Sequence, residues 1–288
     1  MASTRSDVVA VTVTLNGLPW IEQCLESLSG VETVVVDHGS TDGTVELVRE
    51  RFPDVRLIEQ ENKGYGAGLN AGFRSASPSY YFVINSDAWV VGDAVERLAA
   101  FADQHPAAAV VAPRLSNPDG SLQRSVRGFP TPWRLATEYF FLRKLAPRSR
   151  LLNAFYAGGF DHDEAREVEW AMGSAFLVRR DASDAVGLFD ESFFMFSEET
   201  DWFYRFHGAG WAIWFVPDAE VVHVGGASHG GRMFGENVRG HVQFFAKHHG
   251  ARRAARVRRL LIVALRLRGV LFRGERGRMY RDAVRSLR

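Results

Sequence analysis

The first 115 residues alternate short runs of β-branched residues with helical patterns, and this alternation limits the possible folds more than any other feature. The runs that predict strands are Val8–Thr14, Val31–Asp37, Val55–Glu59, Tyr80–Asn85 and Ala108–Pro113. The helices between them are predicted at Leu18–Ser29, Thr44–Arg51, Ala67–Ser75 and Asp93–Gln104. Strands that alternate with helices form βαβ units, which build a mostly parallel sheet with helices on its faces. The sequence therefore predicts an α/β fold, in which ligands bind beyond the C-terminal ends of the strands.

The second half of the chain is less regular. Residues 129–168 show no clear periodicity, and we expect them to form a variable region over the site. Strands are predicted at Val168–Val178, Ala212–Val216 and Glu220–Val224, and helices near Asp181–Val186 and at Glu198–Ala209 and Arg232–His249. We expect one domain over residues 1–250, with a nucleotide-binding half at 1–115 and an acceptor half at 116–250.

The composition is that of an ordinary globular protein. Of the 288 residues, 46% are hydrophobic and 24% are charged, which suits a large core. Cys24 is the single cysteine, so an intramolecular disulfide framework is excluded. Residues 1–7 hold no apolar signal-peptide core, and no apolar stretch reaches the roughly 20 residues that span a bilayer. We therefore expect a cytoplasmic protein.

A polar segment follows the predicted strand that ends at Asp37, and it reads Asp-His-Gly-Ser-Thr-Asp-Gly-Thr over residues 37–44. A carboxylate at a strand end can accept hydrogen bonds from a nucleobase or a ribose, and glycines let the backbone approach a ligand. The alternative is a polar turn in which Asp42 or Thr44 caps the next helix. We predict that Asp37 binds a ligand.

A glycine-rich segment, Asn-Lys-Gly-Tyr-Gly-Ala-Gly-Leu-Asn, occupies residues 62–70 between a predicted strand and a predicted helix. The N-terminal amides of a helix favour anions. The spacing matches neither a dinucleotide-binding fingerprint nor a Walker loop. The alternative is a tight connection between strand and helix.

Two further polar groups lie at strand ends and suggest a metal. Asn85-Ser86-Asp87 follows an apolar strand, and His223 ends another. A hard divalent cation prefers oxygen ligands and can share them with a diphosphate, and imidazole is a common metal ligand. Alternatively, Asp87 caps a turn and His223 is a hydrogen-bonded structural group.

A cluster of acidic residues opens a predicted helix as Glu-Glu-Thr-Asp-Trp over residues 198–202. Acidic residues at a helix N-terminus are favourable for electrostatic reasons alone. Beside an apolar wall, however, a carboxylate also suits a general base with a raised pKa.

In this order the motifs resemble glycosyltransferase family 2, whose members are inverting enzymes with a GT-A fold. The resemblance runs from about Val8 to Phe245 and includes Gly-Ser-Ala-Phe-Leu-Val-Arg-Arg at 173–180 and Val-Gly-Leu-Phe-Asp-Glu at 186–191. Six motifs in sequence make it specific. Within the family the chain is most similar to bacterial rhamnosyltransferases that build cell-wall linkers and O-antigens. The resemblance implies a mostly parallel central sheet flanked by helices.

The resemblance also implies residue roles. Asp37 matches the aspartate that binds the base of the nucleotide, Asp87 matches the metal-binding aspartate, and His223 matches a late histidine that completes the metal site. Glu198 and Glu199 match a Glu-Asp pair whose second member is the usual catalytic base, with Asp201 or Glu198 next in line. The expected donor-binding residues are Thr14, Asn16, Asp37, Gly39, Ser40, Asn62, Lys63, Gly64, Gly66, Asn70, Asn85, Ser86 and Asp87. The expected acceptor-binding residues are Trp170, Gly173 and Trp202. Tryptophans are expected because sugar faces stack on aromatic rings; Trp211 is a further candidate, and core packing is the alternative for at least one of the three.

Three positions depart from the family pattern. His38 stands where asparagine is usual, so contacts with the base can differ. Asn85 replaces the first aspartate of the metal motif, which leaves one carboxylate for Mg²⁺ or Mn²⁺. Glu199 is one methylene longer than the usual aspartate.

The implied reaction is a direct displacement, in which the base deprotonates an acceptor hydroxyl that attacks C1 opposite the diphosphate. The expected donor is dTDP-rhamnose or, second, a UDP-sugar, and the expected acceptor is a glycan or a polyprenyl-linked sugar. A sugar nucleotidyltransferase would carry a Gly-rich Arg-x-x-Lys loop, whereas residues 16–19 read Asn-Gly-Leu-Pro. A non-catalytic nucleotide-sugar-binding module would lack the carboxylates. The sequence leaves the oligomeric state open.

Residues 251–288 form a basic tail that is expected to be helical. Residues 252–288 hold 13 arginines against Glu275 and Asp282, a net charge of +11, whereas the whole chain carries +1. Leu260, Val263, Ala264, Leu267, Val270 and Leu271 share one face of a helix. This pattern predicts an amphipathic helix on the inner face of the plasma membrane. The alternative is packing of the stripe on the domain, and no nucleic-acid partner is expected because no recognition motif accompanies the charge.

Overall fold

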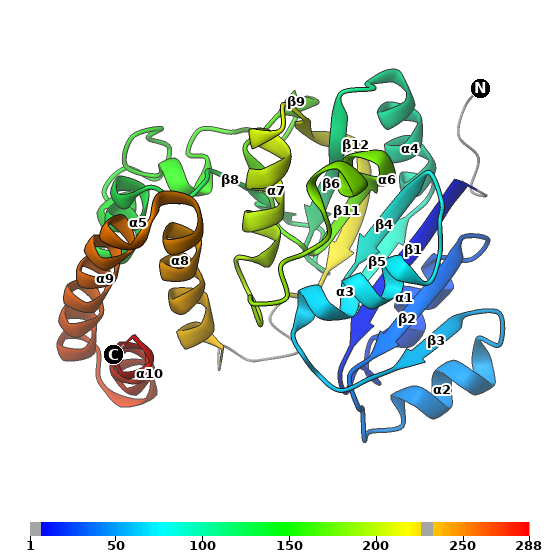
Figure 1. Cartoon of the computed structure of the whole chain (residues 1–288), viewed down its shortest axis with the longest axis horizontal. Coiled ribbons are helices and arrows are strands. Elements are labelled where there is room, and N and C mark those ends of the chain that lie inside the picture. The colour runs from blue at the N-terminus through cyan, green and yellow to red at the C-terminus, as the bar shows by residue number, and fades with distance from the viewer. Residues whose placement is uncertain (1–6, 226–232, 288) are drawn as a thin grey trace.

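A ten-stranded sheet organises the chain, in the order β3-β2-β1-β4-β11-β6-β12-β5, with β7 paired to β6 and β9 paired to β12 (Figure 1). The structure, a computed structural model, describes residues 7–225 and 233–287. Its strands are β1 Val8–Thr14, β2 Glu32–Asp37, β3 Arg56–Glu59, β4 Tyr80–Ile84, β5 Ala88–Val91, β6 Ala108–Ser116, β7 Leu122–Gln123, β8 Val126–Arg127, β9 Arg166–Glu167, β10 Trp170–Ala171, β11 Ala175–Arg179 and β12 Ala212–His223. Its α-helices are α1 Ile21–Ser27, α2 Thr44–Arg51, α3 Tyr65–Arg74, α4 Ala94–Gln104, α5 Pro132–Tyr139, α6 Arg180–Val186, α7 Glu198–Gly208, α8 Phe234–His249, α9 Ala251–Leu271 and α10 Gly274–Ser286.

Strand β1 shows why the β-branched runs form this sheet. All seven of its residues are buried, because helices cover both faces of the sheet. Val9 and Val11 pack into one core cluster, and Val8 and Ala10 into the other, as the two-residue period of a strand requires.

The parallel register brings the candidate site residues to one edge. β1 pairs in parallel with β2 and with β4, and Thr14 lies level with Asp37. The loops that follow these strands therefore meet at the C-terminal edge of the sheet. This confirms the predicted α/β fold.

The second half differs from the prediction in its strands. The strand predicted at Val168–Val178 is broken into β10 and β11, and β11 runs antiparallel between β4 and β6. The two strands predicted at Ala212–Val216 and Glu220–Val224 form the single strand β12, which has a register shift between Val216 and Glu220. Strand β5, absent from the prediction, pairs with the end of β12 and places His223 beside Ala88.

The region 129–168, which had no clear periodicity, contains α5 and the two short 3₁₀ helices Leu142–Lys144 and Ala154–Tyr156. Thr131 caps α5 through its hydroxyl, which accepts the Arg134 N–H at 3.1 Å, and Pro132 occupies the first turn. Helix α5 contacts α9, so the region is tied to the basic tail.

The basic tail forms a helical hairpin of α9 and α10 that packs on α8 and α5 (Figure 1). The buried side of α9 includes Val257, Leu261 and Leu265, whereas Val263 and Val270 face outward. Helix α8 begins at Phe234, and the predicted start at Arg232 lies outside the described residues. None of the helices in the described residues is both long and apolar enough to cross a membrane.

Candidate active site

Two loops meet where β1 and β2 end. The buried Asp37 carboxylate accepts the backbone N–H groups of Gly39 and Ser40 on Oδ2, at 2.9 and 2.8 Å. In the other loop, Asn16 donates its backbone N–H to Ser40 Oγ at 2.8 Å and accepts the Thr41 N–H on Oδ1 at 2.9 Å. Ser40 Oγ also contacts Asp37 Oδ1. The Asp37 carboxylate therefore already accepts hydrogen bonds from its own loop, and any contact with the nucleobase of a donor would be made in addition to these.

His38 and Thr14 lie buried beneath this loop pair. Burial lowers the pKa of His38 against the opposing effects of Asp37 and Asn62, so its imidazole is neutral at pH 7, and its Nε2 lies 3.2 Å from the Gln60 amide nitrogen. Within the described residues the Thr14 hydroxyl is buried without a hydrogen-bond partner. Thr14 remains a predicted donor contact, and His38 remains the position at which contacts with the base can differ from the family pattern.

The glycine-rich segment that enters α3 packs against the loop before α7. Gly64 has a φ of 106°, and a Cβ there would lie 2.3 Å from the Phe194 carbonyl oxygen. That oxygen accepts the Tyr65 N–H at 2.9 Å, and Asn62 Oδ1 accepts the Gly64 N–H at 3.0 Å. Glycine is required at residue 64 by this close packing, which is a structural role. Asn62 and Lys63 are exposed on the loop and remain predicted donor contacts.

Asn70 and Gly66 both lie against the segment 189–191. The Asn70 side chain accepts the Phe189 N–H at 3.0 Å and donates to the Phe189 carbonyl at 3.0 Å and to Glu191 Oε1 at 2.8 Å. A Cβ at Gly66 would lie 3.0 Å from Phe189 Cβ. The predicted donor contact of the Asn70 side chain is therefore corrected, because all its polar atoms hold the segment 189–191, whereas the donor contact of Gly66 stays a prediction.

Tyr65 links the two halves of the site, and the sequence analysis did not select it. Its hydroxyl donates to Asn85 Oδ1 at 2.7 Å and lies 3.3 Å from the Gly173 carbonyl oxygen. Burial, followed by the nearby carboxylates of Glu198 and Glu199, raises its pKa well above the usual value. Tyr65 thus stays a neutral donor between the predicted base and the predicted metal ligands. Its position inside the glycine-rich motif was the available signal.

The predicted metal ligands Asp87 and His223 converge. Both are buried, and His223 Nε2 lies 3.4 Å from Asp87 Oδ1. Ser86 is buried next to Asp87. In the described residues no group of three or more His, Cys, Asp or Glu side chains is placed to hold a metal. A cation held here would therefore complete its shell with other oxygens, as Mg²⁺ and Mn²⁺ do when they share a diphosphate.

Gln123 determines which nitrogen of His223 can bind a metal. The amide nitrogen of Gln123 donates to Asn117 Oδ1 at 2.9 Å and to the His223 carbonyl at 3.1 Å, so its Oε1 faces His223 Nδ1 at 2.7 Å. Because Oε1 can only accept, Nδ1 carries the proton and the Nε2 lone pair points toward Asp87. Nε2 also lies 3.3 Å from the Asn85 amide nitrogen. These residues fit a divalent cation, and the short strand that carries Gln123 had no sequence signal.

Glu198 and Glu199 form a coupled acidic pair at the start of α7. Burial raises both pKa values, and the charge of Glu199 raises that of Glu198 further. Backbone amides, including that of Gly173, partly offset the shift at Glu199. The upward shift is therefore the stronger one at Glu198, where burial and the charge of Glu199 act in the same direction. In the described residues one oxygen of each carboxylate is buried without a hydrogen-bond partner.

Asp201, predicted as an alternative base, belongs to a structural ion network on the other side of α7. Its fully buried carboxylate contacts Arg205 Nε at 3.0 Å, Lys247 Nζ at 2.8 Å and His248 Nε2 at 2.7 Å. Burial opposes its ionisation, but His248, Lys247 and Arg205 outweigh that effect and lower its pKa. The catalytic prediction for Asp201 is therefore corrected to a structural role.

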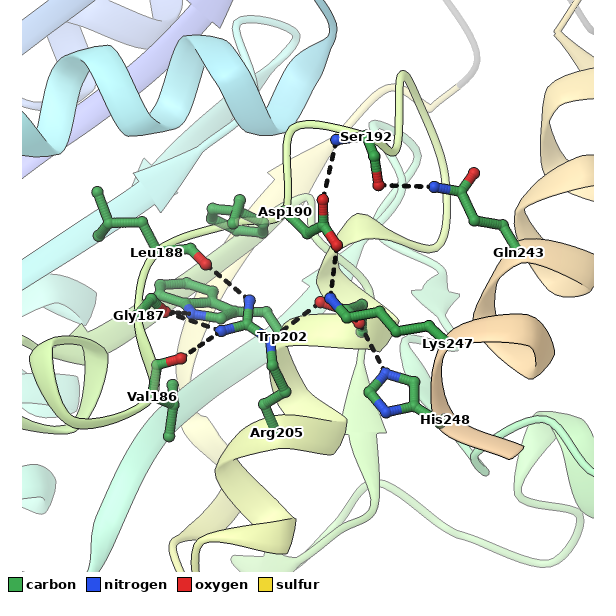
Figure 2. Close-up of polar contacts among 12 residues, drawn as sticks. Val186, Gly187, Leu188, Asp190, Ser192, Trp202, Arg205, Gln243, Lys247 and His248 are labelled. Atoms are coloured by element: carbon green, nitrogen blue, oxygen red, sulfur yellow. Dashed lines mark hydrogen bonds and ion pairs between the residues drawn. The ribbon is translucent and has the colours of Figure 1, made fainter. Parts of the chain in front are cut away.

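Figure 2 shows how this network joins three segments of the chain. Lys247 on α8 also binds Asp190 at 2.6 Å, and Gln243 donates to Ser192 at 2.8 Å. Arg205 on α7 donates to the backbone carbonyl oxygens of Val186, Gly187 and Leu188, at 2.6–3.0 Å. The network thus ties α7 and α8 to the loop that precedes the acidic pair.

The Asp201→Asn variant is expected to lower the free energy of unfolding by about 2–4 kcal/mol, because it removes the buried carboxylate charge that pairs with Arg205, Lys247 and His248. Folding lowers the pKa of Asp201, so the ionised carboxylate stabilises the folded protein at every pH above its unfolded pKa of about 3.9. This stabilisation is lost as the pH falls through the folded pKa. Denaturant unfolding at pH 7 measures the effect, with Glu199→Gln as the control that should not lose stability. Unchanged stability combined with lost turnover would restore a catalytic role for Asp201.

Of the predicted acceptor residues, Trp202 is a core residue. It is fully buried, its ring lies 4.1 Å from that of Phe189, and its Nε1 donates to the Gly187 carbonyl at 2.8 Å. The predicted acceptor contact is wrong because no ring face is left for a sugar. Trp170 is also largely buried, beside Phe155. Gly173 lies against Glu199, whose Cγ would be 3.5 Å from a Cβ at that position, and its acceptor role stays a prediction.

Comparison with known proteins agrees with this geometry. The family model described as Glycosyl transferase family 2 matches residues 9–185. Over 230 residues the chain is 34% identical to N-acetylglucosaminyl-diphospho-decaprenol L-rhamnosyltransferase of Mycobacterium tuberculosis, and the match covers 74% of each protein.

Two solved structures, each 17% identical to the chain, share its fold. One is a mannosyltransferase from Pyrobaculum calidifontis in complex with GDP-Man and Mn²⁺, with a TM-score of 0.58 over 98% of this chain and 84% of that one. The other is S. aureus TarS 1–349 in complex with UDP-GlcNAc, with a TM-score of 0.57 over 97% and 80% of the respective chains. The fold is thus GT-A, and the chain belongs to glycosyltransferase family 2 as a rhamnosyltransferase-like enzyme.

Proposed function

We propose that this glycosyltransferase transfers L-rhamnose from dTDP-rhamnose to a hydroxyl of a lipid-linked sugar, with inversion at C1. The M. tuberculosis relative, named as an L-rhamnosyltransferase of N-acetylglucosaminyl-diphospho-decaprenol, supports both substrate classes. A UDP-sugar is the second candidate donor. Family membership removes the sugar nucleotidyltransferase and the non-catalytic module as alternatives.

The observation that carries the proposal is the acidic pair at the start of α7. Burial raises the pKa of both carboxyls, the charge of Glu199 raises that of Glu198 further, and backbone amides partly offset the shift at Glu199. A direct displacement needs one base, which takes the proton of the acceptor hydroxyl while its oxygen attacks C1. Glu199 supplies that base, and displacement from the face opposite the diphosphate inverts the anomeric centre.

Asp87 and His223 are the residues that would hold Mg²⁺ or Mn²⁺. Bound there, the cation would neutralise charge on the departing diphosphate. Asp87 contributes the negative charge, and Gln123 keeps the Nε2 lone pair of His223 directed at the same point. Tyr65 holds Asn85 beside them through its hydroxyl.

In transfer assays with a soluble acceptor analogue, we expect product to form from dTDP-rhamnose at least about tenfold faster than from UDP-sugars. A site built to hydrogen-bond one donor discriminates strongly against a donor that leaves those polar groups unpaired. Activity should disappear in excess chelator and return with Mg²⁺ or Mn²⁺. The anomeric configuration of the product, measured by NMR, tests inversion. Faster transfer from a UDP-sugar would show that the donor is a UDP-sugar and not dTDP-rhamnose. Full activity in excess chelator would contradict the metal site and indicate that Asp87 binds a sugar hydroxyl.

A further inference from the structure

Exposed apolar side chains are concentrated at one end of the molecule. Eleven large hydrophobic residues in the described part of the chain are exposed, and seven of them fall within residues 133–151 and 263–271. These seven are Trp133, Leu145, Leu151, Val263, Leu267, Val270 and Leu271. The most exposed are Val270 at 83%, Leu145 at 77% and Leu271 at 72%. Side chains this exposed do not contribute to the core, and a cluster of exposed apolar side chains indicates an interaction surface.

Contacts fix the two segments side by side. The Phe141 ring lies 5.8 Å from the Phe272 ring and 3.9 Å from the Arg268 guanidinium. Arg268 is buried and donates to the backbone carbonyl of Tyr139 at 2.8 Å. The segment after α5, which carries Leu145, is thereby held against the end of α9, which carries Val270 and Leu271. Figure 1 shows α5, α9 and α10 together, at the end of the molecule away from α2.

Basic side chains surround these apolar residues. Ten arginines are exposed in α9, in α10 and in the short connection between them: Arg252, Arg253, Arg256, Arg259, Arg266, Arg273, Arg276, Arg278, Arg281 and Arg285. An open groove between the two helices is lined by Arg266, Arg281, Arg285, Gly269, Val270 and Val284. Lys144, Arg148 and Arg150 are exposed on the neighbouring segment. A surface that mixes exposed leucine and valine with arginine complements an anionic lipid surface, because acyl chains accept the apolar groups and headgroups pair with the guanidiniums.

We propose that Leu145, Val270 and Leu271, together with the arginine-lined groove, form a single docking face for an anionic membrane. The face thus includes the segment after α5 as well as the basic tail. The predicted stripe is divided in the structure, since Ala264 packs inside while Val263, Leu267, Val270 and Leu271 face outward. The docking face rests on the proposed lipid-linked acceptor, which it would place within reach of the enzyme. Exposed leucine and valine side chains make no favourable contact with the phosphates of a nucleic acid, whereas they can insert among acyl chains. A membrane is therefore the favoured partner.

Flotation of the full chain with vesicles tests the docking face. Binding is expected to phosphatidylglycerol-containing vesicles at low salt and to fall sharply on phosphatidylcholine alone. Leu145→Asn, Val270→Asn and Leu271→Asn combined, which change no charge, should weaken binding at least about tenfold. Arg266→Gln with Arg285→Gln should weaken it by about fivefold per arginine and flatten its salt dependence. Val91→Asn with Arg49→Gln, exposed positions on β5 and α2, is the matched control and should bind as the unaltered chain.

Three results would overturn the docking face: no binding at low salt, equal binding of the apolar variant and the control, or equal binding to neutral and anionic vesicles. Binding of duplex DNA that the apolar substitutions leave unchanged, without vesicle binding, would assign the arginines to nucleic acid instead. Transfer from dTDP-rhamnose to a soluble acceptor analogue, measured without vesicles, reports the proposed function separately. If the chain binds vesicles but does not transfer rhamnose, the docking face is supported and dTDP-rhamnose is rejected as the donor.

Discussion

The Glu199→Gln variant is expected to lose turnover by about 10²–10⁴-fold, the usual contribution of a general base, while it keeps its affinity for the donor nucleotide. The amide has nearly the same shape but cannot take the proton of the acceptor hydroxyl. Turnover by a product assay and donor affinity by titration calorimetry separate the two effects, because a base acts mainly in the transition state.

Glu198→Gln is the matched control for this prediction. Burial and the charge of Glu199 raise the pKa of Glu198 and so favour its protonated form. Glutamine imitates that form, so the change should cost far less than the change at Glu199. Near-normal turnover of Glu199→Gln together with a large loss at Glu198→Gln would exchange the two roles.

The pH profile follows from the same pair. Because burial raises the pKa of Glu199, the base is ionised only above a value higher than the usual 4.3 or so for glutamate. Activity should therefore fall as the pH drops through that raised value, and this acid limb should remain in Glu198→Gln.

The second large effect is expected at Asp87. Asp87→Asn removes the one carboxylate that faces His223 Nε2, and it should lower turnover by about 10²–10³-fold, as loss of a group that stabilises transition-state charge does. Binding of Mn²⁺ in the presence of the donor nucleotide, followed by electron paramagnetic resonance, should weaken in parallel. Metal binding that survives Asp87→Asn would place the metal site elsewhere.

Gln123 gives a sharper version of this test, because it does not touch the proposed cation. Gln123→Leu removes the acceptor that holds the proton on His223 Nδ1 and should weaken Mn²⁺ binding by about 10–100-fold, as loss of an outer-shell partner does. Gln123→Glu retains an acceptor oxygen and should recover much of the loss. Equal Mn²⁺ affinity in the leucine and glutamate variants would contradict the orienting role of Gln123.

The parallel sheet and its catalytic edge were predictable from sequence because their signals are local. The apolar run of β1 is buried on both faces, so a continuous β-branched segment is itself evidence for a covered parallel strand. Polar residues at the C-terminal ends of parallel strands lie at the same edge of the sheet. The positions of Asp37 and Asp87 at this edge could therefore be predicted from the sequence. Glu198 and Glu199 were found because they open a helix beside an aromatic run.

The roles of individual polar side chains were decided by contacts between distant parts of the chain. Asn70 has a motif position that suggests a ligand, but its partner Phe189 lies 119 residues away. Gln123 orients His223 across 100 residues, and Asp201, three positions after Glu198, faces Lys247 on α8 instead of the site. A side chain's period along a helix or strand predicts which face it occupies. Which group it meets there depends on how that face packs, and only the tertiary structure determines that.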